Sequence, residues 1–190
     1  MERTAEDNQP KGLSRAYLLV LVGFSAAAFL ARWIGLTIPV AGTGGVNIDP
    51  REIFVTLGSA FTGPVGGIVI GFFGGIASFP SQTVVVHMVS GLFLGFLYKP
   101  VYNRWPMPKL LLGWAVLIAD YYYIFIIPTF LATVLLTYPG GLSDIFGADL
   151  GFLQAYIILV QAASLEALAT LIITAIVLLA LPKYYRRPLW

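Results

Sequence analysis

The architecture of this chain follows from one glycine-rich stretch, Gly63-Pro64-Val65-Gly66-Gly67-Ile68-Val69-Ile70-Gly71-Phe72-Phe73-Gly74-Gly75. Its glycines at positions 63, 67, 71 and 75 recur every four residues, which places them on one stripe of a helix. In water each interior glycine would cost a helix about 1 kcal/mol relative to alanine. In a bilayer the backbone must bond with itself, so the helix forms and the stripe becomes a groove for a neighbouring helix. The stretch therefore predicts the central helix of a compact membrane bundle.

Composition indicates an integral membrane protein. The 190 residues are 58% hydrophobic and only 11% charged, whereas soluble domains carry about 25% charged residues. Mean hydropathy is +0.86. The length allows about six spans of roughly 20 residues each, so we predict an all-α integral membrane protein with a bundle of six transmembrane helices. Because the chain has no cysteine, it can form no disulfide, thiolate metal site or cysteine nucleophile.

The chain divides into a polar N-terminal tail at 1–14, a membrane domain at 15–182 and a basic tail at 183–190. Its first apolar run is too long for a cleavable signal peptide. The predicted spans lie at about 15–36, 49–62, 63–79, 82–100, 108–138 and 152–181. A glycine-rich loop at 39–47 joins the first two spans and could act as a lid or as a simple connector.

The second span begins with Asp49-Pro50-Arg51-Glu52, a helix-start pattern. Asp49 suits the N-cap, Pro50 the first helical position, and Glu52 the place three residues after the cap. In the fourth span, His87 shares one face with Gly91 and Gly95. We therefore expect this face to be closely packed against a neighbour.

Basic residues fall mostly on one side of the predicted bundle. With six spans, nine of the eleven lysines and arginines lie on the side of the two termini, and only Arg32 and Arg51 lie on the other. By the positive-inside rule, both termini are expected in the cytoplasm.

Asp120 in the fifth span and Glu166 near the middle of the sixth are the only acids that we place inside predicted spans. Ionisable residues at such depth are costly and usually functional. If the two helices are neighbours, the carboxylates could hold a cation or a donor-rich substrate. Alternatively, they form a structural pair hydrogen-bonded to Tyr, Gln or Thr side chains.

Other polar or aromatic side chains are candidates for binding a small molecule. Gln154 and Gln161 stand seven residues apart on one face of the sixth span, where amides suit the edge of a heterocycle or hold helices together. Tyr123, the last of three consecutive tyrosines, could stack on a flat ligand or simply pack. His87 is either a ligand-binding residue or a hydrogen-bonded core residue, and Asn47 either caps its loop or touches substrate.

No catalytic arrangement is evident. The chain has no Ser–His–Asp constellation, no metal-ligand spacing and no Walker motif, so we expect no enzyme activity, no cofactor and no nucleic-acid partner. An intramembrane protease would need paired acids or metal-binding histidines, and the single histidine is His87.

Four segments form a recognisable pattern: Ala27-x-x-x-Ala31, Asn47-Ile48-Asp49-Pro50-Arg51-Glu52, Gly58-Ser59-Ala60-Phe61-Thr62-Gly63-Pro64-Val65-Gly66-Gly67 and Ser90-Gly91-Leu92-Phe93-Leu94-Gly95-Phe96-Leu97-Tyr98. With the chain length, the span count and the glycine-rich first loop, this pattern resembles the substrate-binding S components of energy-coupling-factor (ECF) vitamin transporters. The resemblance covers roughly the whole chain and is densest between Ala27 and Tyr98.

The resemblance implies a subunit of the plasma membrane of a prokaryote that captures a water-soluble vitamin or related micronutrient from outside. Its partners would be a membrane coupling (T) protein and two ATPase subunits, which hydrolyse the ATP. Ala27 and Ala31 would form the face that docks on the coupling protein, and the first loop would close over the substrate. The single histidine argues against nickel or cobalt as cargo.

The sequence leaves the ligand and two other functions open. Aromatic residues and carboxylates suit thiamine or a pyrimidine precursor, while riboflavin, biotin, folate and a queuosine precursor stay compatible with these residues. The alternatives to transport are a membrane scaffold similar to the cell-shape protein MreD and the membrane domain of a sensor. A ligand in the outer half of the bundle would favour transport, and a solid core would favour the scaffold.

Overall fold

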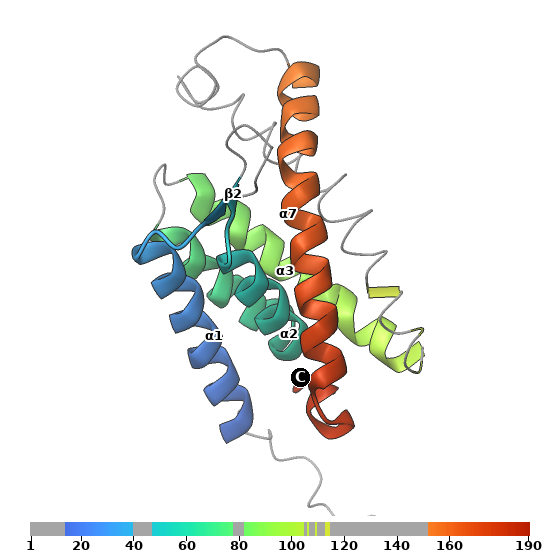
Figure 1. The fold of residues 1–190 in the computed structure, drawn as a ribbon. Helices are drawn as coiled ribbons and strands as arrows, with labels where there is room; N and C mark the ends of the chain where they lie inside the picture. Colours follow the sequence, from blue (N-terminus) through green and yellow to red (C-terminus); the bar gives the residue numbers. More distant parts are fainter. Residues whose placement is uncertain are drawn as a thin grey trace, which may run out of the picture.

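The computed structural model describes residues 14–39, 47–77, 82–104, 106, 109, 113–114 and 152–190. Its elements are α1 (Arg15–Trp33), β1 (Ile38–Pro39), β2 (Asn47–Ile48), α2 (Arg51–Ile76), α3 (Gln82–Arg104), α7 (Phe152–Ala180) and a short 3₁₀ helix, η3 (Lys183–Arg186). The fold is all-α apart from one antiparallel strand pair, in which Ile38 faces Ile48 and Pro39 faces Asn47. Figure 1 shows α1 and α7 on either side of α2, with α3 running obliquely across the bundle.

Three helices among the described residues are long and apolar enough to cross a membrane: α1, α2 and Val84–Arg104 of α3. They indicate a multi-pass membrane protein. The helix α7 matches the predicted sixth span almost residue for residue, and its part Leu168–Ala180 is a shorter apolar helix. Nearly all of the predicted fifth span at 108–138 lies outside the described residues.

The helix α2 reverses direction at Gly63, whose φ of 74° and ψ of −170° are not helical. In a straight helix Arg51 and Gly74 would lie about 34 Å apart. Instead, Arg51 Nη1 donates a hydrogen bond of 3.1 Å to the carbonyl oxygen of Gly74. The element is therefore a hairpin of two antiparallel arms, 51–62 and 64–76. This confirms the predicted boundary at Gly63-Pro64.

Each arm of the hairpin is shorter than a membrane is thick. At 1.5 Å per residue the arms are about 18 to 20 Å long, whereas the hydrocarbon core measures about 30 Å. The length and composition of α2 as one element would allow a single crossing, but its folding back excludes that. The second and third predicted spans are therefore two short arms that share one turn.

The glycine stripe of the second arm packs closely against a neighbouring helix, as predicted, and the structure identifies that helix as α3. A Cβ atom on Gly67 would collide with the carbonyl oxygen of Gly91, and one on Gly71 with that of His87. One on Gly95 would collide with the backbone of Gly63 and Pro64. The two helices thus touch backbone to backbone along a seam that admits only glycine, which is how membrane helices gain close packing.

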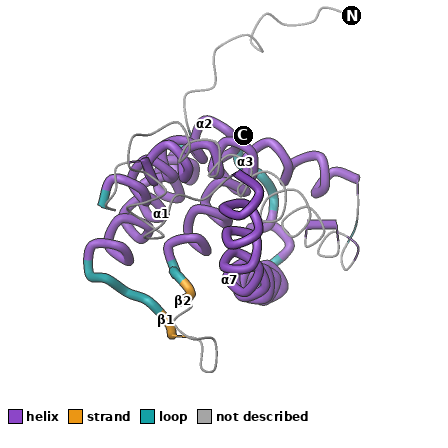
Figure 2. The backbone as a smooth tube through the Cα atoms, turned by 90° about the horizontal axis from the view of Figure 1, so that it is seen from above, coloured by secondary structure: helices purple, strands orange, loops and turns teal. Residues whose placement is uncertain are grey.

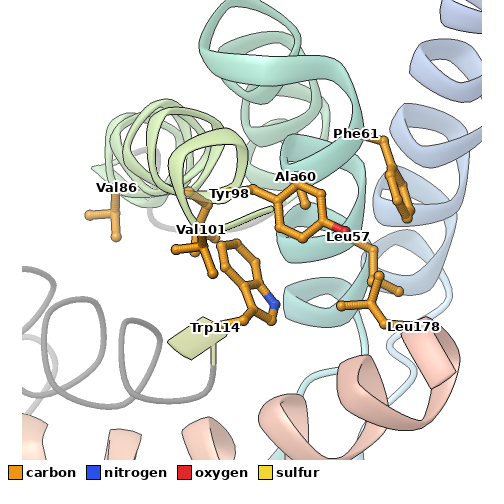
Figure 3. Packing of buried hydrophobic residues seen from close by; sticks show 9 residues of the cluster. Leu57, Ala60, Phe61, Val86, Tyr98, Val101, Trp114 and Leu178 are labelled. Atoms are coloured by element: carbon orange, nitrogen blue, oxygen red, sulfur yellow. The ribbon is translucent and has the colours of Figure 1, made fainter. Parts of the chain in front are cut away.

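Two apolar clusters surround the hairpin. The larger joins its first arm to α3 and α7 and consists of Leu57, Ala60, Phe61, Val86, Leu94, Tyr98, Val101, Trp114 and Leu178 (Figure 3). In this cluster the Tyr98 ring stands nearly perpendicular to the rings of Trp114 and Phe61, with centroids 5.0 and 6.0 Å away. The smaller cluster, Ala28, Val55 and Ile70, joins α1 to both arms. The hairpin is therefore the hub of the described bundle.

The bundle has two distinct ends. The strands β1 and β2 lie at one end, which we call the strand end (Figure 1). The first residues of α1 and the last residues of the chain lie at the other, which we call the tail end. Having both ends of the described chain on one side agrees with the predicted placement of both termini.

Candidate functional site

Four ionisable residues meet at the strand end, and we call them the ion cluster: Asp49, Arg51, Glu52 and His87. Asp49 precedes α2, and its Oδ1 accepts a 3.0 Å hydrogen bond from the backbone N–H of Arg51. This is the capping role predicted for Asp49, since a carboxylate satisfies an N–H that has no partner within the helix. The cap starts the hairpin and sets Arg51 and Glu52 on its first turn.

Glu52 does not complete a capping box. Its Oε1 lies 2.6 Å from His87 Nε2 on α3, so it spans the gap between two helices instead of turning back to its own cap. The whole residues Glu52 and His87 are only 9% and 6% exposed. Hence the statement that Asp120 and Glu166 are the only acids inside the spans is wrong, because the first arm begins by burying Glu52.

Arg51 connects the cluster to both arms of the hairpin. Its Nη2 lies 2.8 Å from Asp49 Oδ2, its Nε 3.6 Å from Glu52 Oε1, and its Nη1 binds the carbonyl oxygen of Gly74. Arg32, at the end of α1, reaches Asp49 Oδ2 from outside at 3.9 Å. The guanidinium of Arg51 thus joins the two open ends of the α2 hairpin. This hairpin lies at the centre of the bundle in Figure 1.

Burying these charges has physical consequences. A buried ion is tolerated only when charges and hydrogen bonds compensate it, and removing one partner leaves the other uncompensated. Among the described residues, no group of three or more His, Asp or Glu side chains could hold a metal ion. The arrangement suits recognition of a polar group or control of helix packing.

The structure brings some of the predicted site residues to the strand end. His87 belongs to the ion cluster. Asn47 lies on β2, which contacts α7, and Figure 2 shows β2 beside α7 in the view from above. Gln154 is exposed on the first turn of α7. Asn47 and Gln154 thus lie on two elements that contact each other, although 107 positions separate them in the sequence.

The other predicted site residues cannot be placed in the same way. Gln161 and Glu166 lie on α7, but their side chains fall outside what the structure describes. Asp120 and Tyr123 lie outside the described residues altogether. The roles of these four residues stay predictions.

The two docking alanines of α1 have different surroundings. Ala27 is half-buried and lines an open groove of about 440 Å³ with Leu19, Val20, Gly23, Phe24 and Phe54. A Cβ atom on Gly23 would meet nothing within 4 Å. Ala31 is only 4% exposed, so it packs inside the described bundle. The accessible small-residue face of α1 is therefore Gly23 with Ala27.

Sequence reasoning missed Glu52 as the partner of His87 and Arg51 as the residue that joins Glu52 to Asp49. Glu52 and His87 stand 35 positions apart. The glycine stripes carried only part of the signal, because they do not say which glycines pair. The observed pairing of Gly67 with Gly91 brings His87 level with Gly71, near the open end of the hairpin where Arg51 and Glu52 begin. No family model matches this chain, and no curated protein or solved structure matches it significantly.

Proposed function

We propose that this chain is the membrane-embedded S component of an ECF-type importer, a bundle of six membrane helices in which the two arms of the α2 hairpin are short, with both termini in the cytoplasm of a prokaryote. It would capture a water-soluble vitamin or related micronutrient at the strand end. A coupling protein and two ATPase subunits would supply the energy for delivery. The proposal rests on the sequence resemblance and on how polar groups are distributed through the bundle.

The observation that carries the proposal is the ion cluster at the strand end. An apolar bundle that buries Glu52, His87 and Arg51 at one end places its polar chemistry where a substrate from outside would arrive. Buried ionisable residues in membrane helices commonly mark substrate pathways. The strand β2 contacts α7, and the strand pair lies at this end of the bundle. The loop between the strands, at 40–46, lies outside the described residues, and its closing over a ligand is part of the proposal.

The test is whether the protein retains and binds a micronutrient. Native mass spectrometry of the purified chain should detect a bound small molecule, and calorimetry with that molecule gives its affinity. In Glu166→Gln, which keeps size and removes charge, affinity should fall about tenfold or more, because hydrogen bonds to charged groups are worth that factor. Glu6→Gln, in the N-terminal tail, is the matched control.

One result would contradict this proposal, and another would revise the binding site within it. A purified protein that carries no ligand and binds none of the micronutrients tested would favour the scaffold function. Unchanged affinity in Glu166→Gln would remove Glu166 from the site while leaving a bound ligand to be explained by other residues.

Docking on the coupling protein gives a second prediction. In the double variant Gly23→Leu with Ala27→Leu, large side chains fill the open groove on α1 and hold a partner helix away. Substrate affinity should persist, while co-purification with the coupling module and uptake should be lost. Ala31→Leu is the contrasting variant, because its buried position predicts a loss of stability instead. If the double variant still co-purifies with the module, docking uses another face.

A further inference from the structure

The last eight residues, 183–190, lie against the turn of the α2 hairpin, and we call them the strap. The backbone N–H of Leu189 donates a 2.9 Å hydrogen bond to the carbonyl oxygen of Phe61, which is the second-last residue of the first arm. The indole of Trp190 packs on Gly63, in the space that a Cβ atom would need. Two residues of the strap thus contact the turn directly.

Residues of α3 hold the strap from the other side. Lys99 Nζ donates a 2.7 Å hydrogen bond to the carbonyl oxygen of Trp190 and lies 4.3 Å from the centre of its ring. The hydroxyl of Tyr98 donates a 2.7 Å hydrogen bond to the carbonyl oxygen of Arg186. Arg186 in turn caps the end of α7 through the carbonyl oxygens of Leu181 and Leu179, at 2.7 and 2.9 Å. The strap therefore connects the hairpin turn, α3 and α7.

The turn needs such a cover. A reversal at Gly63 leaves carbonyl groups of the first arm without helical partners. The turn contacts α3 at Gly95. Nine further residues of α3, about 13 Å of helix, follow Gly95. The turn consequently lies within the length of α3, and its irregular backbone needs hydrogen-bond partners from protein or water. The strap supplies one hydrogen bond and an aromatic cover.

The strap is also built to come away. Only one backbone hydrogen bond and the contacts of Trp190 fasten its end to the turn, and Trp190 is still 37% exposed. Its first four residues form η3, and 3₁₀ helices have weaker hydrogen-bond geometry than α-helices. Tyr184 and Tyr185 are 62% and 63% exposed, so they add little to the hold.

We propose that the strap is a detachable closure of the tail end: while bound it keeps water from the hairpin turn, and on release it opens the turn to the aqueous side. Lys99 and Trp190 form the fastening. This inference concerns the described residues alone and stands whether or not the chain is a transport subunit.

Thiol labelling tests the closure. Because the chain has no cysteine, Thr62→Cys provides a single reporter beside the turn, at a position that is 1% exposed. The purified full chain is treated with a small cationic thiol reagent, and the labelling rate is measured. Adding Trp190→Ala should raise that rate about tenfold or more, since it removes the indole that covers Gly63 together with its cation–π contact to Lys99. Tyr185→Ala removes an aromatic ring from the same strap without touching the turn and should leave the rate unchanged.

Two further variants separate strap release from unfolding. Ser59→Cys, which is fully buried about one turn deeper in the first arm, should stay protected in the Trp190→Ala background. Lys99→Met keeps the length of the side chain and removes its charge, so it should also accelerate labelling of the Thr62→Cys reporter. If Trp190→Ala does not yield folded protein, the Lys99→Met result decides. Rates that match the Tyr185→Ala control, or rapid labelling with the native strap, would overturn the proposal.

Discussion

Gly67→Leu is expected to abolish folding of the bundle or to lower its melting temperature by about 6 to 12 °C or more. A Cβ atom at this position collides with the carbonyl oxygen of Gly91, and backbone cannot rotate away as a side chain can. Overpacking typically costs about 1–3 kcal/mol and more where backbones must separate. For a chain of this size each kcal/mol corresponds to about 2–4 °C. Gly71→Leu should behave alike, because it meets the carbonyl oxygen of His87.

A glycine elsewhere in the bundle provides the matched control. Gly23 also lies within a helix, but it faces open space, so Gly23→Leu should leave the melting temperature nearly unchanged or raise it slightly. Thermal unfolding of the three purified variants in the same detergent gives the comparison. Equal stability of Gly67→Leu and Gly23→Leu would mean that the glycine stripe does not pack against α3.

Local spacing was enough to predict the two close-packed faces that form this seam, but not that they pack against each other. Four-residue spacing aligns Gly63, Gly67 and Gly71 on one stripe, and the same spacing aligns His87, Gly91 and Gly95 on α3. Only another backbone-rich face can fill a glycine groove closely, so each stripe implied a partner of its own kind. The turn was predictable too, because Gly63 permits a positive φ and Pro64 favours a helix start.

Residue spacing alone could not predict the ion cluster. Whether Glu52 meets His87 depends on how far the hairpin slides along α3, and periodicity fixes the face of a helix but not its height against a neighbour. Glu52 had a sufficient local explanation as part of a helix start, which concealed its contact with α3.

The small residues of α1 and the strap show the same limit. Small side chains allow close contact with either a partner or the bundle itself, and the sequence does not tell which. Ala31 turned inward while Ala27 lines a groove. The charges of the strap predicted only its side of the membrane. Its docking on Gly63 depends on the exact position of a turn that forms from residues more than 100 positions earlier.

Arg51→Met should be among the most destabilising single substitutions in the described part of the chain. It removes the partner of Asp49, the donor to Gly74 and a positive charge beside Glu52 in one step. Breaking a buried ion pair from one side costs about 3–5 kcal/mol, which corresponds to a melting temperature lower by roughly 10 °C or more. Arg32→Met is the control, since its side chain is 33% exposed and 3.9 Å from Asp49, and exposed pairs contribute about 0–1 kcal/mol.

A second substitution separates the two roles that the ion cluster could have. Asp49→Asn in the Arg51→Met background removes the carboxylate that lost its partner, so the double variant should recover part of the stability, and the cycle of single and double variants measures the coupling of the pair. A double variant no more stable than Arg51→Met would contradict a buried, directly coupled pair. If the double variant regains stability but binds no micronutrient, the ion cluster contributes to the ligand site. If both return, the cluster serves to fasten the hairpin, and other residues recognise the substrate.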